Sequence, residues 1–206
     1  MRKFLKKAYR SNYLYPLSWI VDYYFDFLHR EEHWMRFIMN RDILEFLESL
    51  PKDSIKALEI SGEHYKNYFT NYTNYKYPTF DLLNPSLIES TFQVVIVEQV
   101  LEHVKNPFVA CKTIYDLTSP GGTAIINTPF LIRLHGLPDD YFRFTPNGLK
   151  YILESSGFVN VKIKSFGNKR CVQGNLLNWQ KHRFYHSMRN DPNLPVMVWA
   201  FATKPR

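Results

Sequence analysis

The stretch that decides the fold is Phe92-Gln93-Val94-Val95-Ile96-Val97, which is followed directly by Glu98-Gln99. The run is β-branched and almost entirely apolar, which is typical of a central strand in a parallel sheet that is covered on both faces. Ligands of such sheets bind outside the carboxyl ends of the strands. The sequence therefore predicts a buried parallel strand over 92–97, with Glu98 and Gln99 at the edge where a ligand would sit.

Strands and helices alternate on either side of this run. Further strands are predicted over 55–60, 72–77, 123–128, 158–166 and 196–203, and helices over 31–50, 107–118 and 146–156. Thr145-Pro146 supplies an N-cap and a first-turn proline for the last helix, and Gly157 ends it. This alternation predicts an α/β fold with an open, mostly parallel sheet and helices on both faces.

Length and composition favour one folded domain. The chain has 206 residues, of which 45% are hydrophobic and 17% aromatic, so disorder is excluded. No apolar run is long enough to predict a transmembrane helix. Two cysteines without a Cys-x-x-Cys motif indicate neither a disulfide framework nor a structural zinc site. We expect a single domain over 31–206, with its core at 55–166 and C-terminal strands and a loop at 167–206, in the cytoplasm.

The formal net charge of +7 is concentrated at the two ends. Residues 1–10 carry five basic side chains and no acidic one, and residues 155–206 carry nine against Asp191 alone. A solvated surface is the ordinary explanation, and contact with anionic lipid is the functional one. Residues 1–30 are predicted to form a basic, aromatic-rich amphipathic lead-in that packs on the domain or rests at the inner face of a membrane. No nucleic-acid partner is predicted.

Several motifs between residues 55 and 166 occur in an order that resembles a known family. They are Leu58-Glu59-Ile60-Ser61-Gly62, Phe80-Asp81-Leu82, Glu98-Gln99-Val100-Leu101-Glu102-His103-Val104, Asn106-Pro107 and Pro120-Gly121-Gly122. The succession resembles the class I S-adenosylmethionine-dependent methyltransferases of the type 11 kind. The part from Glu98 to Gly122 is fairly specific.

The resemblance implies a Rossmann-like fold, S-adenosylmethionine as cofactor, and donor contacts from six residues at strand ends. These residues are Glu59, Ser61, Gly62, Asp81, Glu98 and Gln99. In this interpretation Glu59 shapes the first turn, the backbone at Ser61 and Gly62 meets the amino-acid end of the donor, and Asp81 faces the adenine. Glu98 and Gln99 would lie beside the methionine part.

Two departures from the family pattern favour a second hypothesis. The first turn has Gly62 alone, where the family has two or three glycines that let the backbone approach the cofactor. Tyr75-Lys76-Tyr77 stands where an acid usually binds the ribose hydroxyls. The alternative to an enzyme is therefore a catalytically inactive methyltransferase-like binding module, for which an anionic surface is the candidate place of attachment.

The long segment over 129–145 holds the candidates for the acceptor side. Methyl transfer mainly needs positioning, and a base only where the acceptor must lose a proton. His135 is the predicted base, while Tyr141 and Arg143 are expected to form a lid or to bind the acceptor. The segment resembles a subgroup associated with cell-surface sugar synthesis, which implies a small-molecule or sugar-like acceptor. No histidine, cysteine or carboxylate spacing indicates a metal site, so none is predicted.

Overall fold

The computed structural model describes residues 32–85, 90–136, 139–183 and 185–206. Within these residues the chain forms a six-stranded sheet of order β2-β1-β3-β4-β6-β5. The strands are β1 (Lys56–Ile60), β2 (Asn71–Tyr75), β3 (Phe92–Glu98), β4 (Thr118–Pro129), β5 (Val159–Phe166) and β6 (Met197–Thr203). β2, β1, β3 and β4 run parallel, and β6 is antiparallel to both β4 and β5. The predicted open, mostly parallel sheet is confirmed.

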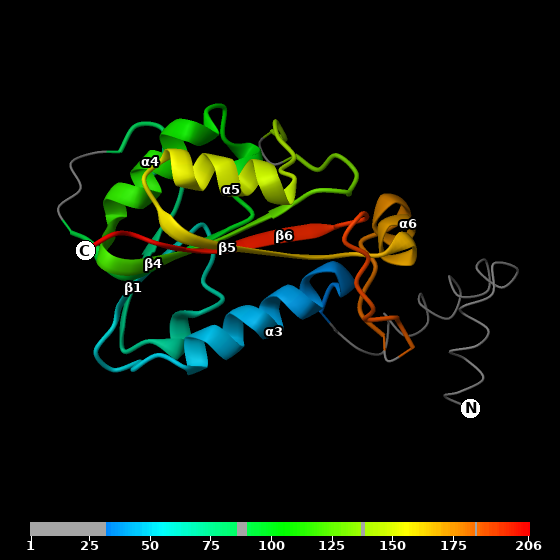
Figure 1. Cartoon of the computed structure of the whole chain (residues 1–206), viewed down its shortest axis with the longest axis horizontal. Helices are drawn as coiled ribbons and strands as arrows, with labels where there is room; N and C mark the ends of the chain where they lie inside the picture. Colours follow the sequence, from blue (N-terminus) through cyan, green and yellow to red (C-terminus); the bar gives the residue numbers. More distant parts are fainter. Residues whose placement is uncertain (1–31, 86–89, 137–138, 184) are drawn as a thin grey trace, which may run out of the picture.

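Helices cover both faces of this sheet, as predicted (Figure 1). One face carries α4 (Pro107–Leu117) and α5 (Pro146–Ser155), and the other carries α3 (Trp34–Glu48). Alternating residues of the strands divide the buried apolar side chains between two cores. Val95 and Val97 of β3 face α4 and α5, while Val94 and Ile96 face α3. This two-sided burial explains why the β3 sequence is apolar without alternation.

The parallel register brings several strand ends to one edge of the sheet. Ile60 pairs with Val97, and Glu98 pairs with Asn127, so the residues that follow β1, β3 and β4 emerge side by side. The short helix η3 (Leu101–His103) follows β3 at this edge. The segment after β1 contains only η2 (Lys66–Tyr68) before β2 begins.

Two motifs differ from what the resemblance implies. Asp81, expected at a strand end, lies with Leu82 in a turn that packs beside α4, and no strand is present at residues 80–83. Pro120-Gly121-Gly122 is an irregular part of β4 rather than a separate turn, with Gly121 at φ +76° and a register shift opposite. The 1–30 lead-in lies outside the described residues.

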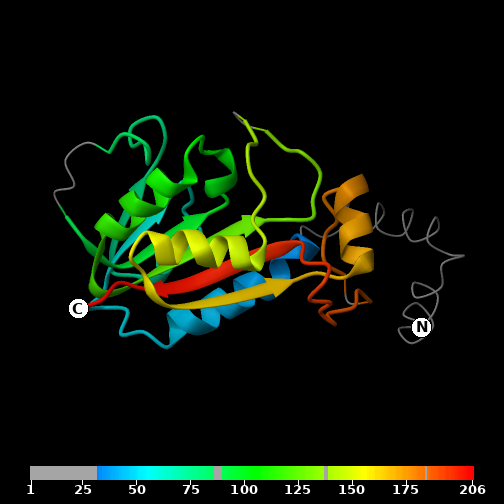
Figure 2. The ribbon, with the colours of Figure 1, turned by 45° about the horizontal axis from the view of Figure 1, so that its top comes forward.

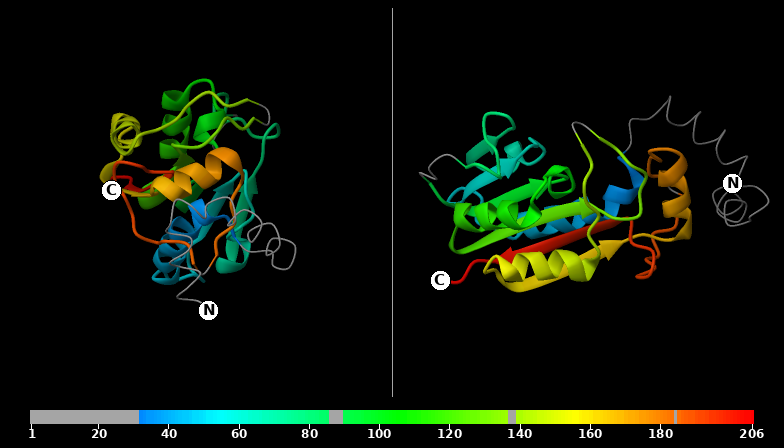
Figure 3. Two further views of the ribbon diagram at one scale, coloured as in Figure 1. Left: turned by 90° about the vertical axis from the view of Figure 1, so that its right-hand side faces the viewer. Right: turned by 90° about the horizontal axis from the view of Figure 1, so that it is seen from above.

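The residues between β5 and β6 extend past the sheet at the end where β5 stops. There α6 (Lys169–Leu177) stands beside the long segment over 129–145 (Figure 2). Figure 3 shows the same neighbourhood from above, with the amino-terminal end of α3 close by. Backbone hydrogen bonds join Trp34 to Gln180 and His182 to Glu32, so this segment is fastened to α3. Among the described helices, none has the length and apolar character needed to cross a bilayer.

Candidate active site

The turn after β1 is built around the carboxylate of Glu59. This side chain is fully buried and accepts hydrogen bonds from the backbone N–H groups of His64 (2.9 Å) and Tyr65 (3.1 Å) and from the Tyr72 hydroxyl (2.7 Å). A Cβ atom at Gly62 would clash with Glu59 Oε1, so a larger residue there would displace the hydrogen-bonded carboxylate. The structure thus gives Glu59 the role of shaping the turn, in the way the sequence suggested.

The end of β2 completes this turn but carries no acid. The Asn74 side-chain amide donates to the carbonyl oxygens of Glu59 (3.0 Å) and Gly62. Ser61 has φ +76° and donates its backbone N–H to Tyr75 at 2.9 Å. In the described stretch from 69 to 85 the sole acidic residue is Asp81.

Asp81 does not lie at a strand end, because no strand forms there. Its carboxylate accepts hydrogen bonds from the Leu83 backbone N–H (2.9 Å) and the Asn84 side chain (3.2 Å). The neighbouring Leu82 carbonyl accepts from the Thr113 hydroxyl of α4 at 2.8 Å. Asp81 therefore closes a local turn, and the expectation of a strand-end acid is corrected.

Glu98 ends β3 and faces α3. Arg36 Nη1 lies 3.2 Å from Glu98 Oε1, and His64 Nδ1 lies 3.7 Å from Oε2. Burial raises the pKa of Glu98, although the charge of Arg36 opposes the shift. Arg36 Nε is buried and receives no hydrogen-bond acceptor from the described residues. A groove of about 600 Å³ between α3 and η2 opens beside His64.

Gln99 takes a left-handed conformation at the first position after β3, with φ +55°. Its backbone N–H donates to the Asn127 carbonyl at 3.1 Å, and its side-chain amide donates to Asn127 Oδ1 at 2.7 Å. These contacts tie the ends of β3 and β4 together. The structure thus brings Ser61, Gly62, Glu98 and Gln99 to one edge, while Asp81 lies in the turn that follows β2.

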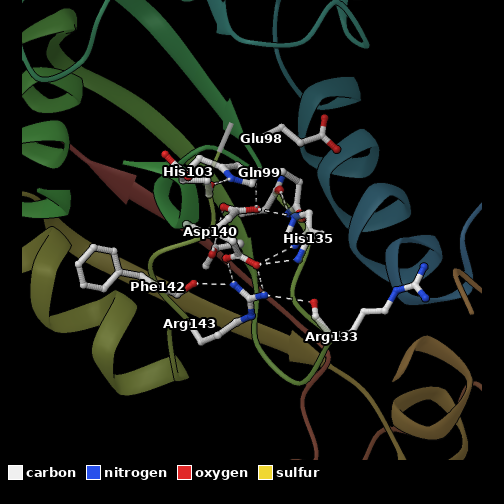
Figure 4. Close-up of polar contacts among 12 residues, drawn as sticks. Glu98, Gln99, His103, Arg133, His135, Asp140, Phe142 and Arg143 are labelled. Carbon is white, nitrogen blue, oxygen red and sulfur yellow. Dashed lines mark hydrogen bonds and ion pairs between the residues drawn. The ribbon is translucent and has the colours of Figure 1, made fainter. Parts of the chain in front are cut away.

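The segment over 129–145 is held by the carboxylate of Asp140. Both terminal nitrogens of Arg143 donate to it, and Arg143 also reaches the carbonyl oxygens of Phe142 and Arg133 (Figure 4). The His135 backbone N–H donates to Asp140 Oδ2 at 2.9 Å, and its ring Nδ1 lies 3.2 Å from the same oxygen. Burial favours a raised pKa for Asp140, but the contacts with Arg143 and His135 outweigh it and lower the pKa to about 2.

Glu102 of η3 lies beneath His103 and His135. Its Oε1 atom is 3.7 Å from His103 Nε2 and 3.8 Å from His135 Nε2, while Oε2 accepts from the Thr128 hydroxyl at 3.5 Å. The side chain is fully buried, and Oε1 receives no hydrogen bond from the described residues. Burial raises the pKa of Glu102 to about 7, and burial also lowers the pKa of His135.

The other predicted catalytic residues have defined surroundings. Arg143 donates to Asp140 from both terminal nitrogens and so ties the segment together, while its contact with an acceptor stays a prediction. Tyr141 is 41% exposed and donates its hydroxyl to Asp139 at 2.7 Å, while its backbone N–H donates to the Glu102 carbonyl. The Trp179 ring lies edge-on to His135 at 5.7 Å and completes this side of the site.

Arg36 and Glu102 are the site residues that sequence reasoning missed. Arg36 belongs to a helix that was predicted from the spacing of its apolar residues, and nothing in that pattern indicated a role for its basic side chain. Glu102 stands in the motif that carried the resemblance, but its proximity to His135 depends on how the segment over 129–145 folds. The run Glu102-His103 was the available signal, because it follows the strongest strand at its ligand edge.

Comparisons with known proteins agree with this architecture. A methyltransferase domain family matches residues 43–126. Phosphoethanolamine N-methyltransferase 2 of Haemonchus contortus, solved with phosphomonomethylethanolamine and S-adenosylhomocysteine, superposes with a TM-score of 0.56 at 13% identity, over 84% of this chain and 56% of that chain. A SAM-dependent methyltransferase from Archaeoglobus fulgidus gives a TM-score of 0.52 at 17% identity, over 89% of this chain and 100% of that one. A comparison with curated proteins found no match.

The strand order and the matching family point the same way. The chain has the Rossmann-like fold of the S-adenosylmethionine-dependent methyltransferases, and its residues 43–126 match a methyltransferase domain, as the motifs around Glu98 predicted. It spans 56% of the length of the Haemonchus enzyme, the first of these structural relatives.

Proposed function

We propose that the chain transfers a methyl group from S-adenosylmethionine to a hydroxyl group of a small-molecule or glycan acceptor. One observation supports this most directly. The sheet edge that carries Ser61, Gly62 and Glu98 also carries a polar cluster of Glu102, which lies in η3 after β3, and His135, which lies in the segment after β4. A donor site and a proton-accepting site would thus share one edge.

The donor side fits the residues present. Arg36 Nε is a buried donor without a hydrogen bond among the described residues, and a carboxylate is the group that a guanidinium pairs with best. We assign Arg36 to binding the carboxylate at the donor's amino-acid end. The backbone around Gly62 would contact the same end of the donor. Glu98 would place negative charge near the positively charged sulfur. When bound, the donor supplies a methyl group whose carbon–sulfur bond breaks as the acceptor oxygen attacks, and the electron pair passes to sulfur.

On the acceptor side, His135 is the proposed proton acceptor. Because burial lowers its pKa, the ring is neutral near pH 7 and its Nε2 atom can take the proton of a hydroxyl. Asp140 lies 3.2 Å from Nδ1, where it orients the ring and stabilises the imidazolium that forms. Tyr141, exposed next to this cluster, is the proposed acceptor contact, and Arg143 is a positioning residue that holds Asp140.

An assay of methyl transfer tests this proposal. The full chain is incubated with S-adenosylmethionine carrying a labelled methyl group and with a panel of monosaccharides, nucleotide sugars and small phenols. We expect labelled product and stoichiometric S-adenosylhomocysteine with one acceptor class. His135→Ala should lower kcat at least about 100-fold, the scale of general-base catalysis, whereas Lys112→Ala on the far side of α4 should not. Equal activity of the His135 variant would contradict the assignment.

A second candidate function is donor binding without turnover. It is favoured by the single glycine in the first turn and by the commitment of Asn74 to the carbonyl oxygens of that turn, which leaves the end of β2 without a ribose-binding acid. This alternative predicts that the donor binds and that no acceptor in the panel is labelled. Labelled product with any acceptor excludes it.

A further inference from the structure

The geometry points to a divalent metal site formed by Glu102, His103 and His135. One ligand atom from each of these residues lies within 4.8 Å of the other two. The three residues come from η3 and from the segment over 129–145, so the site links the end of β3 to the segment that covers it. The sequence predicted no metal, because residues 102 and 135 have no spacing that indicates ligands.

The surroundings of His103 fix which nitrogen is free to bind a metal. His103 Nδ1 forms a hydrogen bond with the backbone carbonyl of Asp139, which can only accept, so Nδ1 carries the proton. The neutral ring then has its lone pair on Nε2. This atom faces Glu102 Oε1 at 3.7 Å. Two acceptor atoms therefore point at each other across a gap.

A related arrangement is found at His135. Its Nδ1 atom makes no hydrogen bond with the described residues but lies 3.2 Å from Asp140 Oδ2, and this negative charge favours the proton on Nδ1 and the lone pair on Nε2. Nε2 lies 3.8 Å from Glu102 Oε1. A metal-binding histidine usually has one nitrogen directed to a carbonyl or carboxylate and the other nitrogen free, as the hydrogen bond of His103 and the Asp140 carboxylate beside His135 provide here.

The burial of Glu102 independently favours a cation between these three ligand atoms. The side chain is fully buried, yet Oε1 receives no hydrogen bond from the described residues. An unpaired buried carboxylate oxygen is costly, and two histidine lone pairs beside it increase the cost. A metal ion at the centre would satisfy all three atoms at once.

The ligand set indicates the class of metal. Two imidazoles and one carboxylate suit zinc, manganese, iron(II) or cobalt, and leave coordination positions open for water or substrate. Ligands at zinc distances of about 2.0–2.1 Å are separated by roughly 3.3 Å in a tetrahedral site. The separations of 3.7 and 3.8 Å to Oε1 are within about 0.5 Å of that value, and the ligand atoms of the two histidines, which lie within 4.8 Å of each other, would move together on binding. Thr128 and Asp140 would form the outer layer that orients the ligands.

A bound metal would also refine the acceptor chemistry, and this part rests on the proposed function. An acceptor hydroxyl in an open position would be acidified by coordination and release its proton to water. His135 would then act as a ligand in place of a base. The two roles of His135 can be distinguished by experiment. Methyl transfer requires metal if His135 is a ligand, and it does not if His135 is the base.

Metal binding is tested on the full, untagged chain after treatment with EDTA and dialysis. Isothermal titration with Zn²⁺ and visible absorption on adding Co²⁺ report the stoichiometry and the ligand type without any donor or acceptor present. We expect one ion per chain, with Co²⁺ bands of a low-coordinate site containing nitrogen ligands. Absence of binding, or Co²⁺ spectra of the hydrated ion only, would overturn the proposal.

Conservative variants assign the site to these residues. Glu102→Gln and His135→Asn should weaken Zn²⁺ binding at least about 100-fold, and Asp140→Asn about 10- to 100-fold because it orients a ligand. His64→Gln is the matched control, since His64 lies beside a carboxylate of the same sheet edge but outside the cluster. Thermal unfolding confirms that each variant is folded. Unchanged binding in both ligand variants would contradict the assignment.

Failure of the metal proposal and failure of the proposed function give different results. Binding of Zn²⁺ is measured without donor, so it can succeed in a chain that transfers no methyl group. Conversely, labelled product that persists in EDTA, together with absent Zn²⁺ binding, would overturn the metal site while leaving methyl transfer established.

Discussion

Gly62 and Ser61 show how single residues shape the turn after β1. Gly62 leaves room for the Glu59 carboxylate, which occupies the position a Cβ would need, and Ser61 adopts φ +76° although it is not glycine. A side chain in this left-handed region costs about 1–2 kcal/mol. The backbone strain of this turn is therefore at Ser61, and the close packing against the Glu59 carboxylate is at Gly62.

Substitutions at Gly62 and at Ser61 should change the free energy of unfolding in opposite directions. Gly62→Ala displaces the Glu59 carboxylate, and we expect it to lower the free energy of unfolding by about 1–3 kcal/mol. Ser61→Gly relieves the left-handed strain, although glycine gains freedom when unfolded, so we expect a change between about 0 and +1 kcal/mol. Urea denaturation measures both. A Gly62 variant as stable as the parent chain would contradict the packing of Glu59.

Glu102 should make stability depend on pH in a predictable direction. Its pKa rises from 4.5 to about 7 on folding, so the folded chain binds this proton more tightly than the unfolded chain. The free energy of unfolding must therefore decrease as the pH rises from about 4.5 to 7, and level off above it. Glu102→Gln removes this contribution, which is on the order of 3 kcal/mol.

Urea denaturation in EDTA at pH 5 and pH 8 tests this expectation. The parent chain and Glu102→Gln should have similar stability at pH 5, and the variant should be the more stable at pH 8. Parallel pH profiles for the two proteins would show that Glu102 titrates at its ordinary value.

Among the elements, those with strong local signals were predicted from sequence. β3 has an uninterrupted apolar run, and α5 has the Thr145 cap, whose hydroxyl accepts from the Gly148 N–H at 3.0 Å, followed by proline. Asp81 was misplaced because its neighbours Phe80 and Leu82 are apolar enough for a strand. Instead, Phe80 stacks on Tyr75, and Leu82 belongs to the buried core that includes the apolar residues of α4, both from within a turn.

The segment over 129–145 is an element whose order depends on one ion pair. Arg143→Lys cannot contact both Asp140 oxygens and two carbonyl groups, so we expect amide exchange at His135 and Tyr141 to accelerate about tenfold or more. This corresponds to the loss of charged hydrogen bonds worth about 1.5–3 kcal/mol. Hydrogen exchange with mass spectrometry measures the change.

Lys112→Ala is the control for this experiment, since it removes an exposed ion pair with Asp116 on α4. Such pairs contribute about 0–1 kcal/mol, so exchange in the 129–145 segment should stay the same. If Arg143→Lys also leaves exchange at His135 and Tyr141 unaltered, the ion pair with Asp140 does not hold the segment.

At the scale of the whole molecule, the site joins parts of the chain that are distant in sequence. Sequence predicted the layers of the fold and the strand-end residues Ser61, Gly62, Glu98 and Gln99, because each follows a recognisable strand. It could not place Glu102 against His135, since that contact requires Asp140 and Arg143 to fold the intervening segment. The sequence also did not predict that α3 is hydrogen-bonded to the residues after α6.

Trp34 tests the attachment of α3 to the C-terminal part. Its ring is fully buried and stacks on His186 at 3.9 Å, and its backbone N–H donates to the Gln180 carbonyl at 2.9 Å. Trp34→Ala should lower the free energy of unfolding by about 3–5 kcal/mol. Tyr151→Ala, at a ring that is 65% exposed on α5, should change it by no more than about 0.5 kcal/mol. Equal effects in urea denaturation would contradict the attachment.

The central claim is that this sheet edge binds S-adenosylmethionine, and one measurement tests it directly. Isothermal titration of the full chain with S-adenosylmethionine and S-adenosylhomocysteine is combined with hydrogen exchange of the complexes. We predict one molecule bound per chain, with slower exchange at Ser61–His64 and Glu98–Val100 and weaker binding in Arg36→Ala. No binding of either compound at millimolar concentration, or protection confined to other parts of the chain, would contradict the account.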